Sequence, residues 1–546
     1  MGLFFDVQCD PLPEHPVLVS SPKIRGTYSI VWTCLSVVLL CTWTVLHLNV
    51  PIETEETKGF RGWLRRKAYL TTRATWWFLV ALVAPELIAC AEVVKRLAAR
   101  HNVKETNRFR GEKERENNQV AEWSLSHAFL ANMGGFAITF KHCEPPPVHD
   151  AATGSSTSRD ITAAPSTLPG DEKGLLKSNV SQQVVEIKHP LGKRFDLPVA
   201  DQNNSDKLAF LFRLRTLGTT LWHRDLEDSE AAKHNAKFVQ SCVRDETRET
   251  LAKTGHSPTS FYDSVMGLRG HTWVLEGSQL LKAAELGIID LPTVRTAEIE
   301  DRSKSDNITT ALALGQSLWF GVQLLFRAVQ DLPTTQLEAL TFGFVICSAI
   351  SFAMVWGKPK NVNTRIEIRA IRCPESVDEV RGIAIKGGIP QWFRRSPANI
   401  NNDTVHACGF KHLKSSIGPS LPMHIAGCTI ALIFGAVHFM AWFYQFPTPQ
   451  EQFLWRIACI VLVALPLPIS ALMLCAQALR LASPKTDRKA KLVKLMPWLV
   501  DGVVILMDTI YVAARLFIMV EAARSLFFLP REAYTTTAAW DIPHIG

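Results

Sequence analysis

Two long apolar segments, at residues 421–444 and 453–479, constrain the fold of this chain more than any other feature. Each exceeds the ~20 apolar residues that an α-helix needs to cross a bilayer. The turn between them contains Pro447 and Pro449 and carries no Lys or Arg. The sequence therefore predicts two antiparallel helices that cross a membrane.

Composition supports a membrane protein and argues against several other classes. Hydrophobic residues make up 47% of the 546 residues, and very apolar segments alternate with strongly polar loops. The 12 Cys show neither Cys-x-x-Cys pairs nor a His/Cys spacing typical of zinc. The net charge of +8 gathers beside apolar segments, and no nucleic-acid-binding motif accompanies it. We therefore expect membrane lipid as a partner, no nucleic acid and no metal.

Further apolar segments predict a bundle of membrane-spanning helices. Their approximate limits are 27–48, 74–94, 308–326, 335–356 and 497–522. Residues 123–140 are shorter and broken, so this segment could cross the membrane or form a re-entrant or tilted piece. The predicted fold class is all-α: a polytopic helical membrane bundle of seven or eight spans with a long cytosolic insertion.

Basic residues set the predicted orientation. Loops 357–420 and 480–496 are rich in Lys and Arg, which places them in the cytosol by the positive-inside rule. The basic residues at 61–73 share that side only if residues 123–140 cross the membrane. That crossing, however, puts the basic stretch 95–121 outside the cytosol, so the positive-inside rule cannot be met by both segments. The sequence does not distinguish the plasma membrane from the endoplasmic reticulum.

The same reading divides the chain into seven parts. Residues 145–173 are rich in Pro, Ser, Thr, Ala and Gly, which predicts a disordered linker. The parts are an N-terminal tail (1–26), a first membrane part (27–140), a linker with a small membrane-apposed soluble region (141–307), a membrane hairpin (308–356), a basic loop (357–420), a three-span membrane part (421–524) and a C-terminal tail (525–546).

Polar side chains recur at heptad spacing inside the predicted spans. His424 and His438 are two heptads apart, and Asp501, Asp508 and Arg515 follow at seven-residue intervals. Such spacing keeps side chains near one helix face, and ionisable groups inside a membrane usually face a polar interior. We therefore predict a catalytic group of His438, Asp508, Asp501 and His424.

Other polar residues in the spans form a predicted substrate-binding set. Pro85 predicts a kink that places Glu86 at membrane depth. The set consists of Glu86, Gln316, Gln323, Arg327, Glu338 and Arg515. Arg327 and Glu338 flank a short turn, which predicts an ion pair. The alternative is that these groups only fix helix register, at ~0.6 kcal/mol each.

Several short motifs resemble those of a large family of uncharacterised fungal multi-pass membrane proteins. The motif residues are Arg25-Gly26-Thr27, Trp43 with His47 and Asn49, Ala84-Pro85-Glu86, Trp123 with His127, Met133 to Phe136, Asp301 to Asp306, Trp319 with Gln323, Leu337-Glu338, Lys358-Pro359, Gly435 to His438, Trp455-Arg456, Ala514 to Leu516 and Pro543 to Ile545. The resemblance implies a filamentous-fungal membrane protein, often present as many paralogues, with a role in specialised metabolism or environmental response rather than housekeeping. It assigns no role to any residue.

These observations leave three functions open. The first is an accessory membrane enzyme that handles a hydrophobic small molecule, such as a lipid or secondary metabolite, with an unknown cofactor. The second is small-molecule or proton-coupled transport through the same polar interior. The third is a membrane scaffold or sensor that holds a cytosolic protein partner on the 174–307 region.

Overall fold

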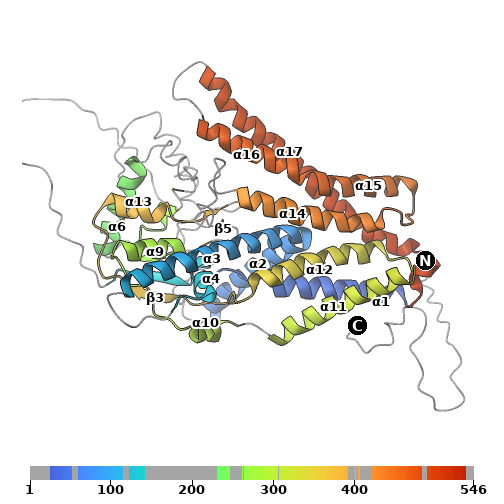
Figure 1. Cartoon of the computed structure of the whole chain (residues 1–546), viewed down its shortest axis with the longest axis horizontal. Coiled ribbons are helices and arrows are strands. Elements are labelled where there is room, and N and C mark those ends of the chain that lie inside the picture. Colours follow the sequence, from blue (N-terminus) through green and yellow to red (C-terminus); the bar gives the residue numbers. More distant parts are fainter. Residues whose placement is uncertain are drawn as a thin grey trace, which may run out of the picture.

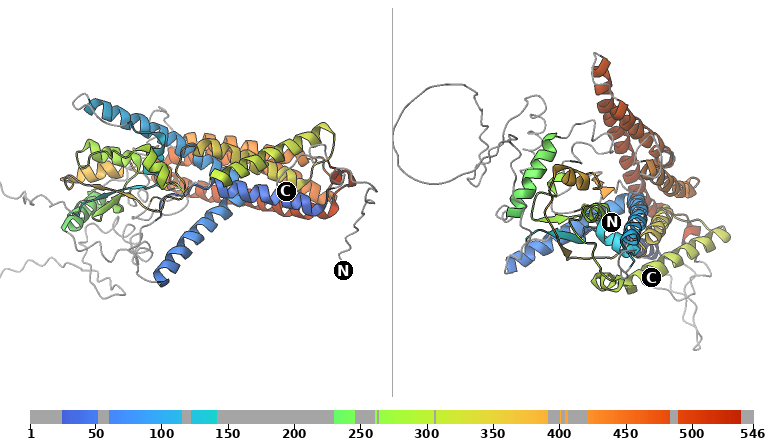
Figure 2. Two further views of the ribbon diagram at one scale, coloured as in Figure 1. Left: turned by 90° about the horizontal axis from the view of Figure 1, so that it is seen from below. Right: turned by 60° about the vertical axis from the view of Figure 1, so that its left-hand side comes forward.

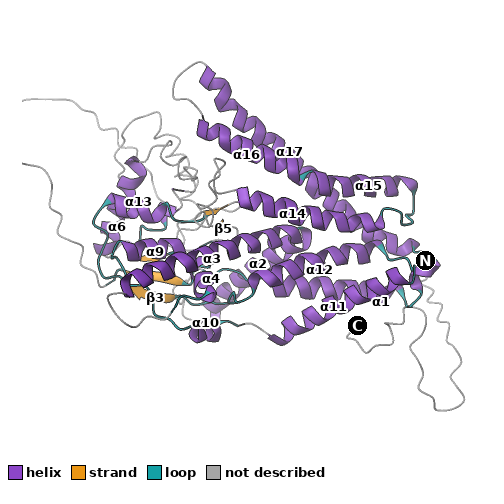
Figure 3. Ribbon diagram, in the orientation of Figure 1, coloured by secondary structure: helices purple, strands orange, loops and turns teal. Residues whose placement is uncertain are grey.

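The computed structural model is mostly helical and divides into a bundle of long helices and a smaller head (Figure 1). Figure 3 shows strands only within the head. The structure describes residues 25–51, 60–114, 122–141, 230–245, 261, 264–304, 307–390, 400, 404–405, 421–482 and 489–536. The predicted linker 145–173 and the 184–187 segment lie outside these ranges.

The bundle consists of long apolar helices, most of which run roughly parallel to one another (Figure 1). Its members are α1 (Thr27–Val45), α11 (Asn307–Val329), α12 (Gln336–Val355), α14 (Leu421–Val437), α15 (Pro449–Ala464), α16 (Pro466–Ala482) and α17 (Lys489–Arg524). Short 3-10 helices continue α14 and α17, as η2 (His438–Ala441) and η3 (Ser525–Phe528), and η4 (Arg531–Tyr534) follows. Within the described residues, six helical segments are long and apolar enough to cross a membrane, with α15 and the first part of α16 counted together.

The expected span at 74–94 is instead two helices at a sharp angle. α2 (Phe60–Val83) and α3 (Pro85–Glu114) are bent by 109° at Ala84. Pro85 causes the break, because its ring disfavours helical geometry at the preceding residue and it lacks an N–H donor. α3 then packs along α12 and α14 and continues into the head.

The head assembles from segments that the spans separate in sequence. Its helices are α4 (Leu125–Asn132), α6 (Glu230–Asp245), α9 (Gly277–Glu285), α10 (Thr296–Arg302) and α13 (Val377–Ala384). Strands β1 (Phe136–Thr139), β2 (Thr272–Val274) and β3 (Ile366–Arg369) form a mixed sheet in the order β2-β1-β3. β1 pairs antiparallel with β2 and parallel with β3. β4 (Ile389–Pro390) and β5 (Thr404–Val405) form a second, two-stranded sheet.

The expectation for residues 123–140 is wrong. This segment forms α4 and the central strand β1, and its apolar side chains pack in the head core. Phe129, Phe136 and Phe140 are at most 1% exposed, and the Phe140 ring lies 4.5 Å from that of Trp273. Burial within the core of the head therefore explains the apolar run. The all-α prediction holds for most of the chain but misses these strands.

Helix packing in the bundle generates a prediction with a matched control. A Cβ at Gly435 of α14 would lie 2.8 Å from Val463 Cγ2 and 3.2 Å from the backbone of Leu462, whereas one at Gly315 of α11 would meet nothing within 4 Å. Gly435→Ala should therefore destabilise the bundle by about 1–3 kcal/mol through overpacking. Gly315→Ala should be neutral or stabilise by up to ~1 kcal/mol. Thermal unfolding in detergent measures both, and equal Tm values for the two variants would contradict the packing described.

Candidate functional site

The break between α2 and α3 leaves two helix ends inside the bundle. Glu86 lies in the first turn of α3, where the helix dipole favours a negative charge. At the end of α2, the carbonyl oxygen of Val83 accepts a hydrogen bond from Nε of Arg515, at 2.9 Å. The two ends thus attract opposite charges, and both charged side chains are at most 3% exposed.

Arg515 is the centre of this buried group. Its guanidinium carbon lies 4.3 Å from the ring centroid of Phe434 and 5.4 Å from that of Phe344. These aromatic faces compensate part of the cost of burying a cation. Glu86 accepts a hydrogen bond from the Tyr511 hydroxyl at 3.0 Å, one helical turn before Arg515 on α17. We call Glu86, His438, Tyr511 and Arg515 the central network.

The contacts of His438 define its tautomer. Its Nε2 lies 3.2 Å from Nη1 of Arg515, which can only donate, so Nε2 accepts. Its Nδ1 therefore carries the proton and donates to the Phe434 carbonyl oxygen at 2.9 Å. Hence the geometry requires a neutral imidazole, held at the start of η2 beside a permanent cation.

Two polar atoms of the central network have no hydrogen-bond partner among the described residues. They are Oε2 of Glu86 and Nη2 of Arg515. Both residues are fully described, yet no ion pair joins them directly. A small cavity lined in part by Pro85, Cys347 and Ser348 lies nearby, although neither Glu86 nor Arg515 lines it. Because buried polar atoms are normally paired, the two unpaired atoms are the candidates in this network for binding a further small polar group.

A second buried group joins the bundle to the head, and we call it the junction. On α3, Glu92 contacts Lys95 at 3.0 Å and Lys358 at 2.7 Å, with the Lys358 side chain 1% exposed. Nearby cations bind the carbonyl oxygens at the ends of two bundle helices. Arg96 donates to Met354 and Trp356 at the end of α12, and Lys360 donates to Trp43 and Thr44 at the end of α1.

Burial shifts the pKa values of two junction groups that lie beyond the helix ends. Desolvation lowers the pKa of Lys358 to about 8, although the Glu92 carboxylate opposes this shift. Desolvation, aided by Lys358 and Lys360, lowers the pKa of His47 to about 3. His47 is therefore neutral near pH 7, and its Nδ1 lies 3.1 Å from the Lys358 carbonyl oxygen.

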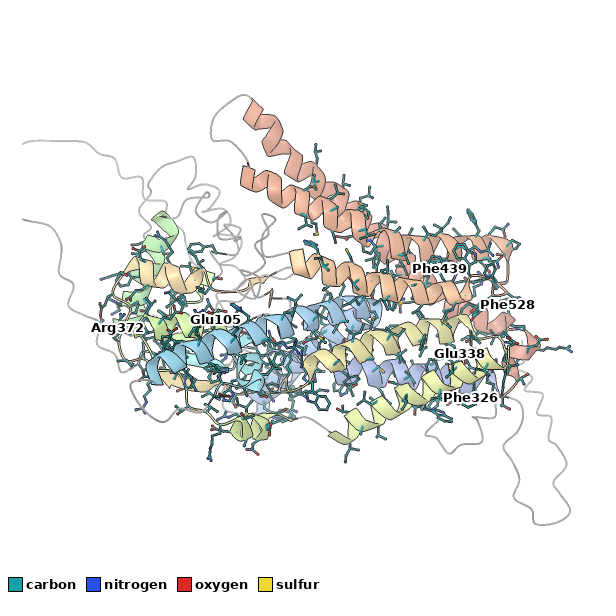
Figure 4. All side chains as sticks on the ribbon, viewed as in Figure 1. Glu105, Phe326, Glu338, Arg372, Phe439 and Phe528 are labelled. Carbon is teal, nitrogen blue, oxygen red and sulfur yellow. The ribbon has the colours of Figure 1, made fainter. Side chains whose placement is uncertain are left out.

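A third group closes the end of the bundle that is farthest from the head. Arg25 binds both oxygens of Glu338, at 2.5 and 3.2 Å. Figure 4 shows Glu338 at this end and Glu105 and Arg372 in the head. The expected Arg327–Glu338 pair is wrong, because Arg327 instead donates to the carbonyl oxygens of Pro333, Ala533 and Thr535.

Of the predicted catalytic residues, the structure brings only His438 into the central network. Asp508 is exposed on α17, and His424 is half-buried near the opposite end of α14 from His438. The side chain of Asp501 lies outside the described residues. The structure therefore separates His438 from His424 and Asp508.

The predicted substrate-binding residues separate into three places. Glu86 and Arg515 belong to the central network, whereas Arg327 and Glu338 close the far end. Gln316 and Gln323 lie on α11; Gln316 is 9% exposed, and Nε2 of Gln323 has no hydrogen-bond partner within the described ranges.

Sequence reasoning missed Tyr511 and the junction. Tyr511 lies four residues before Arg515, so the same helix-face argument applied to hydroxyl groups could have found it. Lys358 belongs to the Lys358-Pro359 motif of the family resemblance, which assigns it no role. No three His, Cys, Asp or Glu side chains in the described part of the chain are placed to hold a metal ion.

Together these features define a mostly helical protein with several helices of membrane-spanning length, a packed head and a buried ionisable network. Residues 6–154 and 264–374 match the model of a family described as a family of unknown function (DUF8562). The match includes Glu86, Glu92 and Lys358, whereas His438, Tyr511 and Arg515 lie beyond it. It agrees with the expected resemblance to an uncharacterised family, while the fungal source stays a prediction. Searches of curated proteins and of solved structures found no match.

The junction generates a stability prediction. Lys358→Met should destabilise the protein by roughly 3 kcal/mol, the lower end for breaking a buried ion pair, because Lys95 remains on Glu92. Lys104→Met, at an exposed position of α3, the helix that carries Glu92, should change stability by less than ~0.5 kcal/mol. Thermal unfolding in detergent compares the two variants. A Lys358→Met protein as stable as the Lys104→Met control would show that the junction does not hold the head.

Proposed function

We propose that the protein is an integral membrane sensor or scaffold, in which the central network in the bundle controls the state of the head. The observation that carries this proposal is the continuity of α3. One 30-residue helix begins at Pro85, carries Glu86 of the central network in its first turn, passes through the junction at Glu92 and ends in the head.

The proposed topology has six membrane crossings, with α2 and α3 entering and leaving the membrane on the head side. Two contacts support it: the end of α1 binds Lys360, and Lys358 of the same segment binds Glu92 of α3. Both α1 and α3 therefore approach the head side, so the chain between them crosses an even number of times. Both described ends of the chain then lie on the opposite side, where Arg25 donates to Ala533.

This topology removes the conflict between the basic segments. With a re-entrant α2–α3 pair, residues 61–73, 95–121, 357–420 and 480–496 all lie on the head side, and residues 123–140 need not cross. The positive-inside rule then places the head in the cytosol. A cytosolic head is where a protein partner could bind.

In the head, α3 contacts two other elements through buried amides. Asn102 of α3 donates to Asn132 Oδ1 at the end of α4 and accepts from the Ser278 hydroxyl on α9, at 2.9 and 3.1 Å. Gly277 also donates to Asn132, and a Cβ there would lie 2.6 Å from Asn102. A shift of α3 would therefore disturb these bonds, which gives the central network a physical route to the head.

Hydrogen exchange of the full-length protein in lipid nanodiscs tests the sensor. Glu86→Gln removes the charge at the start of α3 and keeps the shape of the side chain. We expect exchange to change several-fold at the start of α3 and in residues 125–132 and 277–285, because these segments share its hydrogen bonds. Asp508→Asn, an equivalent change on an exposed position, should leave the head unchanged. A Glu86→Gln effect confined to the break would contradict the coupling.

The unpaired atoms of Glu86 and Arg515 favour a second candidate function, the handling of a small amphipathic molecule by a membrane enzyme or transporter. A molecule with a polar group could bind between these atoms while its apolar part lies among the helices. In this case the charge of each residue would contribute to ligand affinity.

Mass spectrometry of small molecules that copurify in mild detergent tests this candidate. We expect one non-phospholipid species enriched at least about tenfold in wild-type protein and lost in Glu86→Gln, since a lost charged hydrogen bond costs roughly 1.5–3 kcal/mol. Asp508→Asn should retain the species. Recovery of bulk phospholipid alone from the wild type would contradict small-molecule handling and leave the sensor proposal standing.

A further inference from the structure

α2 projects from the side of the bundle. In the left view of Figure 2 it extends away from the bundle as a separate blue helix. Of its residues only Trp77 and Ala81 are buried, both near the end that joins α3. Phe60 and Trp63, near the other end, are 74% and 56% exposed. The first half of α2 thus has large side chains that the described chain does not cover.

The exposed half of α2 is amphipathic. At 100° per residue, Phe60, Trp63, Leu64 and Leu70 fall on one face, within an arc of about 120°. The opposite face contains a group of basic residues, and Lys67 lies within the apolar arc. The basic face consists of Arg61, Arg65, Arg66 and Arg73. This separation of aromatic and cationic faces is typical of helices that lie in a membrane interface.

The position of α2 relative to the bundle fits such a location. Since α3 runs along α12 and α14, the 109° bend directs α2 close to the bilayer plane. Pro85, at the break, lines a cavity with Thr42 and Val45, which belong to the last turn of α1. The break therefore lies near the head-side ends of the spans. Trp76, 50% exposed near this end of α2, is of a residue type that favours the membrane interface.

We propose that α2 lies in the head-side interface and binds anionic phospholipid head groups through Arg61, Arg65 and Arg66. The inference rests on the proposed six-span topology, which puts α2 on the same side as the other basic segments. Phe60, Trp63 and Leu64 insert among the acyl chains, and Lys67 extends its amine towards the head groups. Arg73 anchors the helix by donating to the Asn49 carbonyl oxygen at 2.6 Å.

Anionic lipid fits this surface better than a protein partner for two reasons. The exposed basic side chains lie beside apolar ones along a single helix, which matches the layered head-group and acyl-chain regions of a bilayer. Each basic side chain near an anionic leaflet also strengthens attachment about fivefold. The three arginines should therefore favour an anionic over a zwitterionic bilayer by roughly 100-fold in the docking equilibrium of the first half of α2.

Hydrogen exchange of the full-length protein in two nanodisc preparations tests the proposal. One contains phosphatidylcholine alone, and the other adds a third of phosphatidylserine. Residues 60–72 should exchange at least about tenfold more slowly in the anionic nanodiscs, because head-group contacts hold the helix in the interface. The triple variant Arg61→Gln, Arg65→Gln and Arg66→Gln should lose this difference.

A second triple variant controls for total charge. Lys104, Arg108 and Lys237 are exposed in the head, so their replacement by Gln should retain the lipid dependence. Protection of residues 60–72 in both lipids and in both variants would overturn the proposal by showing a buried or membrane-spanning α2, and would also reject the topology. Weak protection in both lipids would overturn anionic-lipid binding and leave the topology intact.

Discussion

A proline within an apolar segment is the constraint on which the rest of this structure depends. Pro85 ends α2 and begins α3, so a segment long enough to cross the membrane becomes two helices bent by 109°. The break creates a helix end inside the bundle, whose Val83 carbonyl needs a donor. Arg515 supplies it, and the buried guanidinium in turn requires the aromatic rings, His438 and Glu86 around it. One backbone interruption thus explains why ionisable groups gather at this depth.

The second consequence of the break is that α3 packs in both the bundle and the head. Its first turns pack against α12 and α14, and its later turns bind α4 and α9. The junction fixes it between these parts, since Lys360 and Arg96 satisfy carbonyl oxygens at the ends of α1 and α12 while Lys358 pairs with Glu92. The head is built from segments on both sides of α11 and α12, so these cations hold the head to the helix ends.

Hydrophobic length predicted most bundle helices correctly, because crossing a bilayer sets a minimum that few other structures meet. It failed for residues 123–140, since a strand buried on both faces is as apolar as a short membrane segment. Heptad spacing placed Arg515 in the interior and Asp508 beside it, yet Asp508 is exposed. The reason is that this face of α17 contacts Glu86 at Tyr511 and His438 at Arg515, about one and two turns after Asp508, so one helix face meets different surroundings along its length. The spacing of residues along a helix shows which side chains share a face, but it does not show which other helices pack against that face.

Glu86 and Arg515 differ in their contacts from the buried Arg25–Glu338 ion pair at the far end of the bundle. At the far end, Arg25 and Glu338 satisfy each other through two hydrogen bonds, which leaves little reason for either to change partner. Glu86 and Arg515 are as deeply buried but bond instead to Tyr511, Val83 and His438, and each retains an unpaired atom. Burying two charges without direct contact is costly unless a further group stabilises one state. We therefore expect a proton or a polar ligand bound between Glu86 and Arg515 to affect the start of α3, whereas the satisfied Arg25–Glu338 pair offers no such site.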